Sequence, residues 1–510
     1  MDKISASIQD IRQSLRFGWV ALAIVVIEVL SFAGFAFPAF QHIVFFCFLF
    51  AALLITLKNL HYGIIILLME LCVGSKGYLF AVPVGGMTIS IRLGLFIIIF
   101  FCYLIWIIRE RSMTFFHWPL RYPYMLLFAM ILISPLVGRF HGNTLSNIFF
   151  DANGYLYFLL IGPMTQAIKN RKQLNQLLAA VTVAALLIAL ETLVLLFLFS
   201  HIKNFPQSWY VIYRWIRETG VGEVTIFGSG FPRIFFQSHL YQTMLFFFFG
   251  FLLAHIPTIR SRAAQFPFII TTSSLMIIFL SYSRSFWLAT FVGLGMAFFW
   301  LFWKEKVSWR RLGITLGILL MMFVMDFGIA YGIINIPLSG SSGVNASSLL
   351  TQRTKDISTE PAAASRWQLL KPLAQKAMEH PLLGSGLGST LTYHTADPRV
   401  LEQHPNGEYT TYAFEWGYGD LAFKFGFIGL LVFGYFFFSI IHSGWQAAQP
   451  HNQYAPMIRG FILSLVVLLG IHFFTPYVNH PLGIGWILII SIAFPLLGTN
   501  THSSIEKKQS

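Results

Sequence analysis

Three arginine residues each set a fixed positive charge beside an apolar segment. Arg233 lies in the string GSGFPRIFF, Arg284 lies in SYSRSFW, and Arg366 opens a short helical pattern. Guanidinium groups carry a permanent charge and a fork of donors that matches phosphate oxygens. Three such groups that converge at a membrane boundary can bind the diphosphate of a prenyl lipid and stabilise it as a leaving group.

Each arginine taken alone also has a simpler interpretation. An arginine at a membrane boundary often extends to the lipid headgroups or caps a neighbouring helix. The three residues indicate an anion site only if the fold places them on the same side of the membrane. The elements that carry them therefore have to be located.

The composition indicates an integral membrane protein. Of the 510 residues, 56% are hydrophobic and 11% are charged, whereas soluble domains carry about a quarter charged residues. Many apolar runs reach the roughly 20 residues that cross a bilayer. The net charge of +14 does not indicate nucleic-acid binding, because most lysines and arginines lie in short loops between these runs.

We predict an all-α, polytopic transmembrane helix bundle of about 12–14 spans, with a large, partly helical outer loop between late spans. The predicted spans lie near 18–38, 42–57, 62–82, 91–108, 122–138, 153–168, 175–199, 239–256, 266–282, 285–303, 312–337, 427–443, 458–475 and 480–498. Short loops on one side hold most of the basic residues, so both termini are expected in the cytoplasm. The long polar segments 200–238 and 338–426 then face outward, together with the three arginines.

Both outer segments contain helical patterns. Residues Ser208–Glu218 place Trp209, Ile212 and Ile216 on one face, which is typical of a helix lying in the membrane interface. The second segment has a helical pattern that begins near Arg366, and it closes with the turn-rich string HPLLGSGLGS, residues 380–389. We divide the chain into N-terminal spans (1–238), a core with the large loop (239–443) and C-terminal spans with a tail (444–510).

Several of these strings resemble the O-antigen ligase and polymerase superfamily of bacterial membrane glycosyltransferases. SYSRSFWLA is similar to the family's Ser-Arg segment that opens a span, and Arg366-Trp-Gln-Leu-Leu370 is similar to its Arg-x-x-x-Leu motif. HPLLGSGLGS and Phe425-Gly-Phe-Ile-Gly-Leu-Leu431 follow in the family's order, and RIFFQS at Arg233 is a weaker match. The resemblance covers about residues 233–431. It implies a polyprenyl-diphosphate-linked glycan as donor, bound by Arg233, Arg284 and Arg366 on the periplasmic face of the inner membrane.

The chain departs from the family at the expected catalytic base. Ligases of this family typically carry a histidine eleven residues before the glycine that matches Gly426, and here that position is Glu415. Either Glu415 takes the role of that histidine, or the nearby His404 does so from a shifted position; a carboxylate can act as general base toward a sugar hydroxyl. Glu415 could also be a helix-end carboxylate paired with a basic residue, and His404 a solvated loop residue. The acceptor remains open: another lipid-linked glycan, a lipid core or another hydroxyl.

No cofactor or metal is expected. The sequence lacks an Asp-x-Asp string, and Cys47, Cys72 and Cys102 lie in apolar runs without metal-site or disulfide spacing. Gly384, Gly386 and Gly388 could cradle a phosphate, although a re-entry turn is the commoner role for such glycines.

Carboxylates within the spans suggest an alternative function. Glu28, Glu70, Glu191 and Asp326 could bond to neighbouring helices or mark an ion path. The ion path would suit a lipid-linked glycan flippase or transporter.

Overall fold

The computed structural model describes residues 3–14, 17–84, 87–205, 208–226, 231–256, 261–338, 361–395, 398–402 and 404–498. Within these ranges, eleven helices are long and apolar enough to cross a membrane, and the apolar helices Leu60–Gly74 and His239–His255 are shorter. The predicted all-α, polytopic bundle is confirmed. Residues 339–360 of the predicted outer loop and residues 499–510 of the predicted C-terminal tail lie outside the described ranges.

The α-helices contain most of the described residues. They are α1 (Lys3–Gln13), α2 (Phe17–Ala36), α3 (Pro38–Lys58), α4 (Leu60–Gly74), α5 (Ile91–Glu110), α6 (Arg121–Phe140), α7 (Leu145–Tyr155), α8 (Ile161–Ala167), α9 (Arg171–Ser200), α10 (Ser208–Glu218), α11 (His239–His255), α12 (Arg262–Leu280), α13 (Arg284–Trp303), α14 (Trp309–Ile334), α16 (Pro361–Ala377), α17 (Pro398–Leu401), α18 (Gly417–Ala447), α19 (Ala455–Phe474) and α20 (Pro481–Gly498).

Three antiparallel hairpins and three short 3-10 helices complete the described elements. The hairpins are β1–β2 (Ala81–Val84, Met87–Ser90), β3–β4 (Gly222–Ile226, Pro232–Phe236) and β5–β6 (Leu391–His394, Glu408–Thr411). The 3-10 helices are η1 (Thr114–His117), η2 (Leu156–Leu160) and η3 (Ile202–Asn204). The predicted span near 153–168 is thus a crossing broken into α7, η2 and α8.

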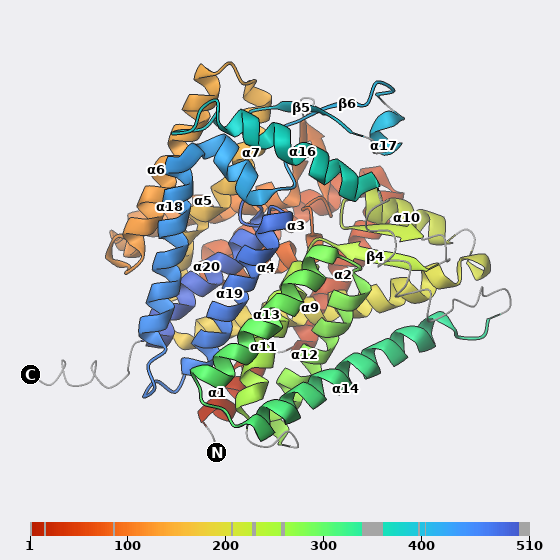
Figure 1. The fold of residues 1–510 in the computed structure, drawn as a ribbon, viewed down its shortest axis with the longest axis vertical. Coiled ribbons are helices and arrows are strands. Elements are labelled where there is room, and N and C mark those ends of the chain that lie inside the picture. The colour runs from red at the N-terminus through yellow and green to blue at the C-terminus, as the bar shows by residue number, and fades with distance from the viewer. Residues whose placement is uncertain are drawn as a thin grey trace, which may run out of the picture.

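The hairpins and the amphipathic helices gather at one end of the bundle, which we call the hairpin end. Figure 1 shows α16, β5 and β6 at this end and α1 at the opposite end. The helix predicted over Ser208–Glu218 is confirmed as α10, with Ile216 buried and Arg214 half-exposed beside Glu218. The helix predicted around Trp367 is confirmed as α16.

Polar residues mark the starts of several helices. Their side-chain oxygens accept a hydrogen bond from the backbone two or three residues further on, which satisfies one of the free N–H groups of the first turn. These capping residues are Asn59, Ser90, Thr144, Asn170 and Ser261.

A break in α18 receives the glycine-rich turn 380–389. Gly426 has φ 64° and interrupts the helix. The freed backbone donors of Phe427 and Ile428 bond to the carbonyls of Pro381 and Leu382, at 2.7 and 3.1 Å. Gly384 and Gly426 approach so closely that a Cβ on either would overlap the other's backbone. Two strings recognised separately in the sequence therefore form one packed unit.

The carboxylates within the bundle differ in their surroundings. Glu70 forms a buried ion pair with Arg92 at 2.7 Å, and Arg92 also donates to the carbonyl of Ser75. The predicted bond to a neighbouring helix is therefore present for Glu70. Asp326 is buried on α14, and neither of its carboxylate oxygens has a hydrogen-bond partner among the described residues.

Replacing Gly386 with alanine should destabilise the protein more than replacing Gly142. Both glycines have φ near +80°, so both substitutions carry the same backbone strain of about 1–2 kcal/mol. A Cβ on Gly386 would also overlap the backbone of Gly138, whereas a Cβ on Gly142 meets nothing within 4 Å. We expect Gly386→Ala to lower Tm and the yield of monodisperse protein well beyond Gly142→Ala. Equal effects would contradict the tight seating of the turn.

Candidate active site

Arg233 and the segment that opens α13 lie together at the hairpin end. Arg233 is in β4, opposite Thr225 of β3, and its Nε donates to the carbonyl of Ser281 at 2.9 Å. Ser281 stands three residues before Arg284, the first residue of α13. The structure therefore brings two of the three predicted arginines to the same turn, from separate elements.

The turn that carries Arg284 is tightly held. Tyr282 has φ 48°, a left-handed conformation that is rare for a bulky residue and is found where the surroundings enforce it. Its ring packs on Phe231, with the ring centroids 4.7 Å apart. The helix dipole of α13 also favours an anion at this end. Arg284 thus has a fixed place at a helix N-terminus.

Arg366 and Glu415 form an ion pair. Nε of Arg366 donates to Oε2 of Glu415, and Nη2 donates to Oε1 at 3.2 Å. The arginine side chain is 40% exposed and the glutamate side chain is 52% exposed. Exposed pairs contribute only about 0–1 kcal/mol, so a ligand can displace either partner at small cost. Arg366, which was predicted to bind phosphate, and Glu415, which was predicted to act as the base, are therefore paired with each other.

Apolar packing fixes where this pair stands. Leu369 and Leu373 of α16 are buried against Phe414, Trp416 and Phe423. The indole Nε1 of Trp416 donates to the carbonyl of Arg366 at 2.7 Å. The backbones that carry Arg366 and Glu415 are therefore held by α16 packing on the start of α18.

The end of α19 contacts both the turn that carries Arg284 and the residues beside Arg366. The ring of Phe474 lies 5.8 Å from that of Trp416, beside the Arg366–Glu415 pair. The next residue, Thr475, has its hydroxyl 3.3 Å from the hydroxyl of Ser285, which follows Arg284. All three arginines and Glu415 thus lie at the hairpin end, around residues 474–475.

His404 is an exposed residue that follows α17. Its backbone bonds to Val400 and Gly407. No hydrogen bond or ion pair within the described ranges joins its ring to Glu415 or to the three arginines.

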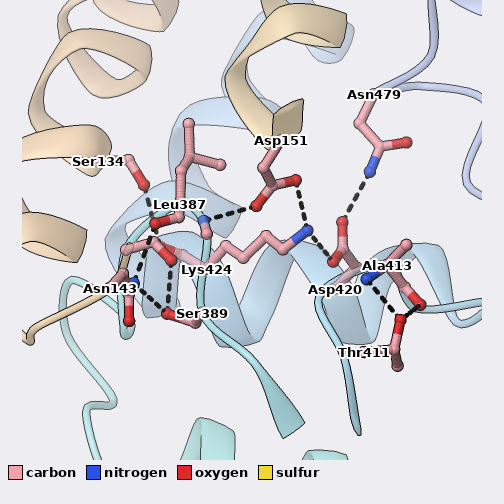
Figure 2. A network of polar contacts seen from close by, with 12 residues as sticks. Ser134, Asn143, Asp151, Leu387, Ser389, Thr411, Ala413, Asp420, Lys424 and Asn479 are labelled. Atoms are coloured by element: carbon pink, nitrogen blue, oxygen red, sulfur yellow. Dashed lines mark hydrogen bonds and ion pairs between the residues drawn. The ribbon is translucent and has the colours of Figure 1, made fainter. Parts of the chain in front are cut away.

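A buried charged network lies beside the site, and the sequence analysis missed it (Figure 2). Nζ of Lys424 lies 2.6 Å from Asp151 and 2.7 Å from Asp420, and all three side chains are at least nine-tenths buried. Asp420 accepts a further bond from Asn479 at 2.7 Å. Lys424 and Asp420 stand four residues apart at the start of α18, and this helical spacing was the available signal. Asp151 is 273 residues away from Lys424.

The glycine turn is not a phosphate cradle in this conformation. Its five consecutive amide groups all donate within the protein: Gly384 to His380, Ser385 to Phe423, Gly386 to Lys424, Leu387 to Ser134, and Gly388 to Asp151. Asn143 also bonds to Ser385, and to Leu387 and Ser389 (Figure 2). The interpretation of this segment as a re-entry turn is therefore the better one.

His480 and Lys76 add polar groups at the same end. Burial, followed by the charges of Arg92 and Lys76, lowers the pKa of His480 to about 3. The imidazole is therefore neutral near pH 7. Its Nδ1 accepts from the backbone N–H of Leu482 at 3.3 Å, so the ring proton is on Nε2, which is a donor and not a base.

The comparison with protein families agrees with these motifs. Residues 269–434 match the family model described as O-antigen ligase. No curated protein matches the chain. The matched segment contains Arg284, Arg366 and Glu415 but not Arg233. The predicted resemblance to the O-antigen ligase and polymerase superfamily is thus confirmed: residues 269–434 of this multi-pass membrane protein match the O-antigen ligase family, which implies glycosyltransferase activity in general.

Proposed function

We propose that the protein transfers a polyprenyl-diphosphate-linked oligo- or polysaccharide to an acceptor hydroxyl on the periplasmic face of the inner membrane. The observation that carries this proposal is the gathering of Arg233, Arg284 and the Arg366–Glu415 pair at one end of the bundle. A prenyl tail can stay in the bilayer while its diphosphate reaches these cations.

In this mechanism the arginines bind the donor and stabilise its leaving group. Arg233 and Arg284 meet the diphosphate first, and the diphosphate then competes with Glu415 for Arg366. Fixed guanidinium groups stabilise the negative charge that develops as the glycosidic C–O bond breaks. They supply the positive charge that a metal ion supplies in other diphosphate sites, so no metal ion is required.

Glu415 acts as the base once Arg366 has moved to the diphosphate. Its oxygens are then free to accept a hydrogen bond from the acceptor hydroxyl. It takes the proton of the acceptor hydroxyl, the acceptor oxygen attacks the anomeric carbon, and the lipid diphosphate leaves. A single displacement of this kind inverts the anomeric configuration.

The orientation rests on the distribution of charge. Basic residues cluster where the helices turn at the end opposite to the hairpin end: Arg109, Arg111, Arg121, Lys169, Arg171, Lys172, Lys304, Lys306, Arg310 and Arg311. Such clusters stay in the cytoplasm during membrane insertion. The hairpin end is therefore assigned to the periplasm, and both termini to the cytoplasm.

A glycan flippase is the second candidate. Buried carboxylates without hydrogen-bond partners among the described residues favour it: both oxygens of Asp326, and one oxygen each of Glu28 and Glu191. Asp326→Asn should abolish a transporter but leave the proposed transferase active.

Replacing Arg284 with glutamine should abolish glycan transfer. Loss of one transition-state donor of this kind costs about 100–1000-fold in rate. The measurement is transfer in proteoliposomes with a lipid-linked glycan donor, supported by electrophoresis of surface glycans from a deletion strain that carries the variant. Arg139→Gln is the matched control, since Arg139 is an exposed arginine near the end of α6. Equal activity of the two variants would rule out the diphosphate site.

Replacing Glu415 with glutamine should lower the transfer rate by about 100-fold or more, the usual contribution of a general base. Donor binding should persist, because Arg366 loses a competing counter-ion. His404→Gln should transfer at the normal rate, since no hydrogen bond or ion pair within the described ranges joins its ring to Arg366 or Glu415. The reverse result, with His404→Gln inactive and Glu415→Gln active, would move the base to His404.

Deleting the gene should identify the acceptor. Lipid A core without long chains would indicate a ligase, and core with a single repeat unit would indicate a polymerase. Loss of a secreted polymer with intact lipopolysaccharide would indicate an exopolysaccharide polymerase. Electrophoresis of the surface glycans separates these outcomes, and unchanged glycans of every class would contradict the proposed transfer.

A further inference from the structure

A large apolar cavity lies between five helices, away from the candidate active site. It has a volume of about 680 Å³ and is lined by α11, α12, α13 and α14, with Leu463 of α19. Its wall on α13 runs from Phe291 to Leu301, and its wall on α14 runs from Arg311 to Leu319. Because α13 begins at the hairpin end and α14 begins at the opposite end, the cavity extends toward the opposite end of the bundle.

The cavity is open to the bilayer side of the bundle. Phe291 of α13 is 78% exposed and Leu316 of α14 is 59% exposed, although both line the cavity. Figure 1 shows α14 running obliquely to α13, so that the two helices diverge along their length. Exposed apolar side chains on spanning helices face lipid chains, and the same chains have access to this space.

One end of the cavity carries a positive charge. Arg311 lines it, and its buried Nη2 has no hydrogen-bond partner among the described residues. Two threonines are the other polar side chains of the lining. Thr315 donates to the carbonyl of Arg311 at 3.0 Å, whereas the buried hydroxyl of Thr271 has no partner within the described ranges.

The charge around Arg311 is also positive. Lys304 and Lys306 lie in the connection between α13 and α14, and Arg310 lies in the first turn of α14. Glu305 is already paired with Arg459 at 2.6 Å. Basic clusters beside a membrane surface attract anionic lipids by about 1 kcal/mol for each charge. The occupant should therefore combine an apolar chain with an anionic group at the Arg311 end.

We propose that this cavity binds an anionic phospholipid, with an acyl chain between α13 and α14 and its phosphate on Arg311. The lipid belongs to the leaflet at the end opposite to the hairpin end. A prenyl-diphosphate donor held by Arg233 and Arg284 would have its charged group at the other end and would leave Arg311 without an anion. The site is thus separate from the proposed transfer reaction.

The test uses the delipidated full chain in mild detergent. Phosphatidylglycerol or phosphatidylcholine is added in mixed micelles, and binding is followed by native mass spectrometry and by Tm. We expect phosphatidylglycerol to raise Tm in a saturable way and to bind more tightly than phosphatidylcholine. Arg311→Gln should weaken phosphatidylglycerol binding by about tenfold and remove this preference. Arg310→Gln, a change at the exposed neighbour outside the cavity, should leave binding unchanged.

A second pair of variants tests the cavity itself. Gly295 lines the cavity, and a Cβ there meets nothing within 4 Å, so Gly295→Leu begins its added side chain in open space. Gly317 has the same free space but lies outside the lining. Gly295→Leu should reduce binding of both lipids, and Gly317→Leu should not.

Three results would overturn the proposal. Unchanged phosphatidylglycerol binding in Arg311→Gln would remove the role of the arginine, and unchanged binding in Gly295→Leu would remove the role of the cavity. Tighter binding of an uncharged prenyl alcohol, also blocked by Gly295→Leu, would show that the cavity takes a prenyl chain. Transfer activity of Gly295→Leu is a separate readout, so loss of lipid binding and loss of the proposed function are distinguishable.

Discussion

The ammonium group of Lys424, buried between two carboxylates, is the interaction on which the hairpin end depends. Burying an isolated charge is costly, and it is tolerated here because Asp151 and Asp420 lie within 2.7 Å. The other oxygen of Asp151 accepts from Gly388, and the carbonyl of Lys424 accepts from Gly386. One ion network thus ties α7, α18 and the glycine turn together, and α16 leads directly into that turn.

The placement of the candidate active site follows from this arrangement. The turn 380–389 follows α16 and seats in the break of α18, so the helix that carries Arg366 is anchored at its C-terminal end. The apolar contacts of Leu369 and Leu373 anchor it along its length. The short β4 strand and the constrained Tyr282 turn place Arg233 and Arg284 independently. The arginines are therefore positioned by separate parts of the fold that meet at residues 474–475.

Local patterns in the sequence predicted most of the bundle. Apolar runs of membrane length gave the long helices, and amphipathic spacing gave α10 and α16, because both signals depend on neighbouring residues. The broken crossing of α7, η2 and α8 was predicted as a single span, since an apolar run does not reveal where a helix is interrupted. Family motifs pointed to the arginines and to Glu415.

Contacts between distant residues could not be predicted in the same way. The pairs Lys424–Asp151 and Arg92–Glu70 join residues whose proximity is decided by helix packing. The pairing of Glu415 with Arg366 was likewise hidden, although a basic partner had been considered for this carboxylate. In the glycine turn, the composition suggested a phosphate site that the structure does not favour. The acceptors of its backbone N–H groups lie within the protein, which favours a structural role.

The Arg366–Glu415 pair also has a consequence for selectivity. A tethered carboxylate is present at a high effective concentration, so any anion that reaches Arg366 must displace it. Phospholipid headgroups with a single phosphate surround the protein in large excess. A single phosphate that replaces the Glu415 carboxylate at Arg366 exchanges one negative charge for another, so little binding free energy is gained. A diphosphate brings more charge and can bridge to Arg233 and Arg284. In the proposed reaction, the pair would thereby favour the more highly charged donor over the abundant lipids of the membrane.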